Sequence, residues 1–74
     1  MDENRKNHGV DRREPVIVDG RVYHLRLTQD QEDGGYIVQC VELPGALEQG
    51  DTPQEAITNG TDAIKSVLQF QLHD

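Results

Sequence analysis

Three histidines and one cysteine are the residues best suited to bind a metal ion or to act as a nucleophile. His8, His24, His73 and Cys40 show no short ligand spacing such as Cys-x-x-Cys or His-x-x-x-His, which would place two side chains on one ion. No base lies near Cys40 in the sequence, and the acidic surroundings disfavour its thiolate. We therefore expect Cys40 to be a small buried apolar residue, and we expect no metal or other cofactor.

Three carboxylates within four residues, Asp30, Glu32 and Asp33, offer a second kind of chemistry, because such groups can hold two metal ions. They lie in a polar, glycine-containing stretch that predicts a loop, and a loop gives a catalytic pair little rigid support. The glycines also lack the spacing of a phosphate-binding loop. The favoured prediction is solvated charge and no enzyme activity. The alternative, Mg²⁺-dependent RNA cleavage, would be lost in Asp33→Asn.

The length and charge of the chain limit its possible partners. It has 74 residues, with 14 acidic and seven basic side chains and a net charge of −7. So small a domain has a thin core, which makes a homodimer or higher homo-oligomer a reasonable expectation. The acidic balance disfavours unaided binding of DNA or RNA, since affinity for phosphate depends on Lys and Arg. One cysteine, no apolar run near 18 residues and no signal peptide predict a cytoplasmic protein away from membranes.

The chain divides into a tail and a domain. Residues 1–14 have one aliphatic residue besides Met1, so little apolar burial offsets the entropy of ordering them, and we expect a disordered tail. Four acids and four bases make this tail neutral. The domain over residues 15–74 then carries all of the net charge, with ten carboxylates against Arg21, Arg26 and Lys65.

The elements that would position these side chains begin with a hairpin over residues 16–28. Asp19-Gly20 is a strong two-residue turn signal. After it, alternating residues predict a half-buried strand, with three side chains in the core, Tyr23, Leu25 and Leu27. A loop over 29–35, a strand over 36–43 and a short strand over 46–49 follow. Pro44 and Gly45 fit the centre of a type II turn, with Gly45 at positive φ.

The clearest helix start lies after this sheet. Gly50 suits the entering turn, Thr52 the N-cap and Pro53 the first helical position, and Glu55 completes a capping box. Apolar residues then recur at spacings of three and four, which predicts one helix with Gly60 approaching the sheet closely; a break over 59–62 is the alternative. The predicted fold class is α+β, a small antiparallel sheet of three to four strands packed on one C-terminal helix.

Residues 34–56 resemble the HicB-like antitoxin family. The resemblance rests on Glu42-Leu43-Pro44-Gly45, on Gln49-Gly50-Asp51-Thr52 and on Glu55-Ala56, and it covers residues 22–72. It makes Pro44, Gly45, Gly50, Thr52 and Glu55 the motif residues. It implies a partial ribonuclease-H-like fold without the metal-binding carboxylates of nucleases.

The resemblance also implies a partner, a small basic HicA-like toxin that cleaves mRNA and whose active-site face the antitoxin covers. An acidic domain suits such a partner, because opposite charge speeds encounter. Asp33, Glu42 and Glu48 are the candidate toxin contacts. Longer family members append an operator-binding segment, and since this chain ends at Asp74 we expect no direct DNA binding. The alternative is a stand-alone homo-oligomeric module that binds a small ligand or another regulator.

Phe70 is the candidate dimer contact. It lies toward one flank of the apolar stripe of the predicted helix, which is wider than a three-stranded sheet can cover. The alternative is that Phe70 folds back onto the sheet edge.

Overall fold

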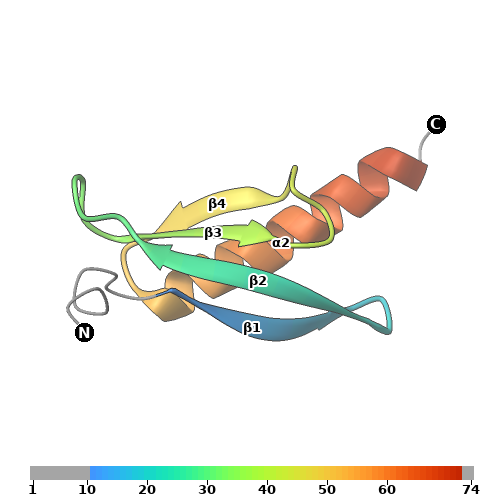
Figure 1. Ribbon diagram of the computed structural model, residues 1–74. Coiled ribbons are helices and arrows are strands. Elements are labelled where there is room, and N and C mark those ends of the chain that lie inside the picture. The colour runs from blue at the N-terminus through green and yellow to red at the C-terminus, as the bar shows by residue number, and fades with distance from the viewer. Residues whose placement is uncertain (1–10, 73–74) are drawn as a thin grey trace.

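A four-stranded antiparallel sheet and one long helix make up the computed structural model, which describes residues 11–72 (Figure 1). The strands, in spatial order, are β1 (Asp11–Val18), β2 (Arg21–Gln29), β3 (Tyr36–Cys40) and β4 (Leu47–Gly50). Helix α2 (Pro53–Leu72) crosses one face of the sheet, and its C-terminal turns extend past the strands. This confirms the predicted α+β class. Within the described residues, no helix is long and apolar enough to cross a membrane.

The hairpin between β1 and β2 closes through the predicted two-residue turn. Asp19 and Gly20 both have positive φ, 53° and 79°, as a type I′ turn requires. Val18 and Arg21 pair directly on either side of this turn.

Strand β1 begins before the predicted domain boundary. Its pairing with β2 starts at Asp11, opposite Thr28, so residues 11–14 are strand rather than tail. The sequence pattern fails here because the side chains are polar, whereas the strand is held by its backbone ladder to β2. Two ion pairs accompany it, Arg12 to Glu14 at 3.0 Å and Arg26 to Asp11 at 3.4 Å. The rest of the predicted tail, residues 1–10, lies outside the described residues.

The turn after β3 forms at the predicted place with a different geometry. The Ala46 N–H donates to the Leu43 carbonyl oxygen at 2.8 Å, which places Pro44 and Gly45 at the centre. Gly45 does not have positive φ, so the type II prediction is wrong. A type II turn needs positive φ at its second central position, whereas a type I turn has negative φ at both central positions. Strand β3 also ends at Cys40 rather than at residue 43, and β4 is displaced by one residue from the predicted 46–49.

Helix α2 begins at Pro53 and continues without a break to Leu72, as predicted. The Glu55 N–H donates to Thr52 Oγ1 at 3.1 Å, so Thr52 is the N-cap. Glu55 Oε1 in turn accepts the N–H of Asp51 at 2.7 Å. In the standard capping box it would accept the N–H of the N-cap residue, so the reciprocal bond is displaced by one residue.

The core lies between the sheet and α2. It contains the three residues predicted from the alternation of β2, and its buried members are Val18, Tyr23, Leu25, Leu27, Val38, Cys40, Ala46, Ala56 and Ile64. Gly60 allows the close approach that its position predicts, since an added Cβ would lie 2.9 Å from Val38 Cγ1.

Gly50 has a different role from the one predicted. It does not have positive φ, so it is not needed for a permissive backbone conformation. Instead, a Cβ at this position would lie 2.5 Å from the backbone nitrogen of Ala56. Gly50 is therefore required where the end of β4 passes the first turn of α2.

Candidate functional site

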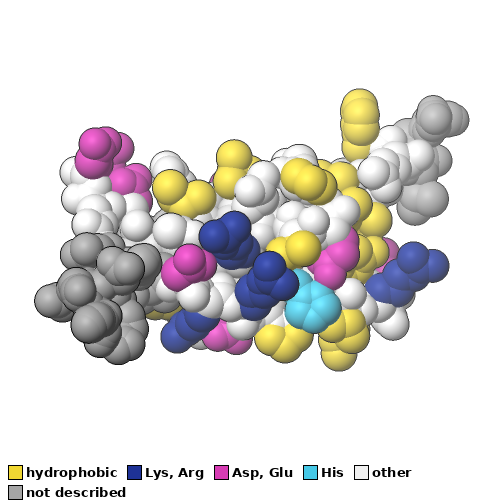
Figure 2. All heavy atoms as spheres, viewed as in Figure 1, with side chains coloured by type: hydrophobic (Ala, Val, Ile, Leu, Met, Phe, Trp, Pro, Cys, Tyr) yellow, Lys and Arg dark blue, Asp and Glu magenta, His cyan; other side chains and the backbone are white. Residues whose placement is uncertain are grey.

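Charge is divided unequally between two parts of the described chain. Residues 11–29, the β1–β2 hairpin, contain four arginines and three carboxylates, a net charge of +1. Residues 30–72 contain eight carboxylates and a single base, Lys65, a net charge of −7. Figure 2 views the sheet face away from α2 and shows basic side chains over its middle with acidic ones beside them, and a further acidic group at the loop between β2 and β3. The acidic character therefore belongs to one part of the molecule.

An acidic hollow lies between the loop that follows β2 and the start of α2. Its volume is about 380 Å³, and its lining includes Asp30, Asp33, Asp51 and Glu55. Asp30 holds the loop in shape, because its Oδ1 accepts the N–H groups of Glu32 at 3.0 Å and Asp33 at 3.2 Å. Asp30 and Glu55 therefore make hydrogen bonds that hold the local structure, whereas Asp33 and Asp51 are exposed residues.

The three predicted contact residues are not brought together. Asp33 precedes β3 at the hollow, whereas Glu42 follows β3 at its other end. Glu48 is exposed on β4, opposite Val38 in the strand register. Because paired residues point to the same face of a sheet, Glu48 lies at the edge of the face that α2 covers.

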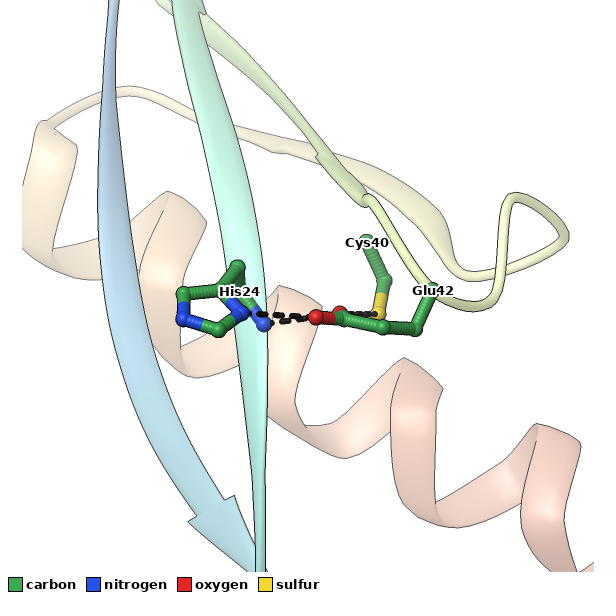
Figure 3. Close-up of polar contacts among 3 residues, drawn as sticks. All are labelled: His24, Cys40 and Glu42. Carbon is green, nitrogen blue, oxygen red and sulfur yellow. Dashed lines mark hydrogen bonds and ion pairs between the residues drawn. The ribbon is translucent and has the colours of Figure 1, made fainter.

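Glu42 belongs to a polar cluster with His24 and Cys40 (Figure 3). Its Oε1 accepts the backbone N–H of His24 at 2.9 Å and lies 3.5 Å from Cys40 Sγ, and its Oε2 lies 2.6 Å from His24 Nδ1. The side-chain and backbone hydrogen bonds from His24 lower the pKa of Glu42 to about 2. This carboxylate therefore joins the turn after β3 to the middle of β2. No local sequence signal marks the pair, since its members are 18 residues apart.

Cys40 is a free, buried cysteine, as the sequence predicts. Burial raises the pKa of its thiol, and the Glu42 carboxylate beside it acts in the same direction, whereas backbone hydrogen bonds partly oppose the shift. Such surroundings favour the unreactive thiol. Within residues 11–72, no group of three or more His, Cys, Asp or Glu side chains is placed to hold a metal ion.

Phe70 lies in the last turns of α2 with 80% of its surface exposed. It does not fold back onto the sheet edge. The structure therefore leaves it available as a contact.

The chain is similar to several proteins of known name. It is 42% identical over 43 residues to Antitoxin HicB 1 of Photorhabdus laumondii, covering 58% of this chain and 28% of that protein. It is 40% identical over 52 residues to Antitoxin HicB of Escherichia coli K12, covering 70% of this chain and 37% of that one. A UPF0150 protein of Synechocystis is 40% identical over 55 residues, covering 73% of this chain and 70% of that protein. The chain matches no protein-family profile and no solved structure.

The fold and the site define a small α+β domain with a polarised surface charge. The chain belongs to the HicB-like antitoxin family, and its relatives carry the names Antitoxin HicB and UPF0150 protein. The matched segments span well under half of the two relatives named as antitoxins.

Proposed function

We propose that this protein is an antitoxin that binds a small basic HicA-like toxin and masks the active-site face with which the toxin cleaves mRNA. The observation that carries the proposal is the net charge of −7 over residues 30–72 in a member of this family. A basic RNA-cleaving protein needs a positive surface to bind phosphate, and an acidic surface can occupy it in place of RNA. In this role the protein is not an enzyme, needs no cofactor and acts in the cytoplasm.

The position of Asp33 at the acidic hollow supports it as a toxin contact. Asp51 lines the same hollow and becomes a further candidate. Both carboxylates are exposed at its rim. Glu48 on β4 is a second contact candidate, since it is also exposed. We assign Glu42 to the fold instead, because both of its oxygens are already bonded to His24.

The test is to search the adjacent genes for one that encodes a small basic HicA-like protein, co-express the two proteins, purify any complex and measure its affinity. We expect co-expression to restore growth and the wild-type protein to form a complex whose affinity falls with salt. The double variant Asp33→Asn/Asp51→Asn should bind at least about tenfold more weakly, mainly through slower association. Failure to form any complex would reject the proposal.

A matched control separates a local contact from the effect of net charge. Asp19→Asn/Asp62→Asn makes the same change of charge at two exposed sites outside the hollow, and Asn is well suited to the positive φ of position 19. We expect this control to bind the toxin with nearly wild-type affinity. Equal weakening by both double variants would show that the hollow is not the contact.

A further inference from the structure

Strand β4 is an outer strand of the sheet, and its backbone directs hydrogen-bonding groups to the outside (Figure 1). The Cys40 N–H donates to the Ala46 carbonyl oxygen at 3.0 Å, and backbone groups along an antiparallel strand alternate in direction. The backbone groups of Leu47 and Gln49 therefore point away from β3, to a side where no further strand of the described chain lies. Asn59 of α2 agrees with this direction, because its side chain donates to the Gln49 carbonyl oxygen at 2.9 Å. The Leu47 N–H, the Leu47 carbonyl and the Gln49 N–H thus face outward.

The side chains of β4 divide between the two faces of the sheet. Leu47 and Gln49 lie on the face away from α2, one residue out of phase with the buried Val38, and with Ile37 they border a hollow of about 310 Å³. Glu48 pairs with Val38 and is exposed at the edge of the face that α2 covers. A strand added at this edge would therefore meet apolar surface on one face and a carboxylate on the other.

We propose that the outer edge of β4 binds an extended basic segment of a partner protein as an additional antiparallel strand. Lysine or arginine of that segment would lie beside Glu48, and apolar side chains at the alternate positions would lie beside Leu47 and Ile37. Charge selects a basic segment, since residues 30–72, which include β4, have a net charge of −7. A second copy of this chain is disfavoured, because antiparallel pairing centred on β4 would place one Glu48 directly opposite the other. With the toxin as partner the inference rests on the proposed function, whereas the edge itself can be tested without the toxin.

The test is a nuclear magnetic resonance titration of the full, isotope-labelled chain with a synthetic peptide of about seven alternating lysine and valine residues. We expect the amide chemical shifts of Leu47 and Gln49 to change most. In the proposed pairing the valines share a face with Leu47 and Gln49, so their N–H groups are the ones that bond to β4. Methylation of the valine backbone nitrogens should therefore weaken binding at least about tenfold. The matched control is the peptide methylated at the lysine backbone nitrogens, which has the same charge and should bind like the unmodified peptide.

Variants of the protein test the same edge from its own side. Leu47→Pro removes an outward N–H, a change that edge strands tolerate, whereas Leu47→Ala removes the same apolar side chain and keeps the N–H. We expect the proline variant to bind the peptide at least about fivefold more weakly than the alanine variant. Glu48→Gln should weaken binding by about two- to fivefold, since it removes the charge that selects lysine. If Leu47→Pro does not fold, the two methylated peptides still decide the question on the wild-type chain.

The outcomes separate this inference from the proposed function. No change of chemical shift at about 5 mM peptide would overturn the inference, as would equal binding of the two methylated peptides, because charge alone would then explain the contact. Changes centred on Asp33 and Asp51 instead of β4 would also overturn it. If a toxin complex forms but Leu47→Pro and Leu47→Ala bind the toxin equally, the toxin does not use this edge and the proposed function stands. Failure of the wild-type chain to form any toxin complex rejects the proposed function and leaves the result with the peptides unchanged.

Discussion

The Nδ1 atom of His24, in the middle of β2, lies 2.6 Å from Oε2 of Glu42, in the turn after β3. The backbone N–H of His24 bonds to the other oxygen of the same carboxylate, and the Val41 N–H donates to the His24 carbonyl oxygen at 2.8 Å. His24 of β2 is thus bonded to Val41 and Glu42, the two residues that follow β3. The family motif that begins at Glu42 is held to the sheet by its acidic first residue.

This pair predicts an acid-sensitive contribution to stability. The pKa of Glu42 is about 2 in the folded protein and near its ordinary value of 4.5 in the unfolded chain. The unfolded state therefore takes up the proton first as the pH falls. The stabilisation is fully present above about pH 4.5 and is lost as the pH falls towards 2. Thermal unfolding followed by circular dichroism between pH 2 and 7 measures it.

Glu42→Gln should lower the melting temperature at pH 7 and flatten its pH dependence between about pH 2 and 4.5. Glu48→Gln is the matched control, because Glu48 is also exposed and has no hydrogen bond of this kind among the described residues. We expect the control to keep the wild-type profile. An unchanged pH profile in Glu42→Gln would show that the pair does not contribute.

Two glycines of the family motifs should respond oppositely to alanine. Gly50→Ala should destabilise the protein by about 2–3 kcal/mol, because the added Cβ would meet the backbone of Ala56, which cannot move without shifting α2. Gly45→Ala should be neutral or stabilise by up to about 1 kcal/mol, since no atom lies within 4 Å of its Cβ and its φ is not positive. Urea unfolding measures both. A large loss in Gly45→Ala would contradict the observed turn geometry.

Contact between α2 and the sheet predicts that Gly60 and Val38 are energetically coupled. Alanine at position 60 favours the helix by about 1 kcal/mol but places a Cβ 2.9 Å from Val38 Cγ1. We expect Gly60→Ala to be destabilising on balance. In Gly60→Ala/Val38→Ala the smaller partner makes room, so the loss should be less than the sum of the two single losses by about 0.5–3 kcal/mol. Strictly additive losses in urea unfolding would refute the coupling.

Substitution of the N-cap residue of α2, Thr52, should lower the free energy of unfolding by less than Gly50→Ala. Thr52→Ala removes the hydroxyl that accepts the Glu55 N–H, and it should cost about 1 kcal/mol in urea unfolding. Thr52→Ser keeps an oxygen at the same place and should be close to the wild type. If alanine and serine lowered stability equally, the effect would come from the lost methyl group rather than from the cap.

Features fixed by neighbouring residues were predictable from the sequence. The Asp19-Gly20 turn and the Thr52 cap each depend on a few adjacent side chains and their backbone, so local composition predicts both. The buried side of β2 followed from its alternation, because Leu25 and Leu27 need only a period of two to share a face.

Features set by strand register could not be predicted in this way. The pairing of His24 with Glu42 depends on where β3 stops and how β2 aligns with it, and neither is encoded near these residues. The start of β1 was missed because polar residues from Asp11 onwards carry no apolar pattern, although their backbone pairs with β2. The need for glycine at position 50 was likewise not predictable locally, because it comes from the close approach of the end of β4 to the first turn of α2.

Pro15 lies near the middle of β1, which is an outer strand of the sheet. Proline has no N–H to donate, and in sheets it is confined largely to edges where that position faces solvent. A strand of another chain that arrived at this edge would therefore lack a hydrogen bond at the centre of the ladder. The sheet is poorly suited to growth by successive addition of strands at this edge, so any self-association of this protein should stop at a closed assembly rather than proceed to fibres.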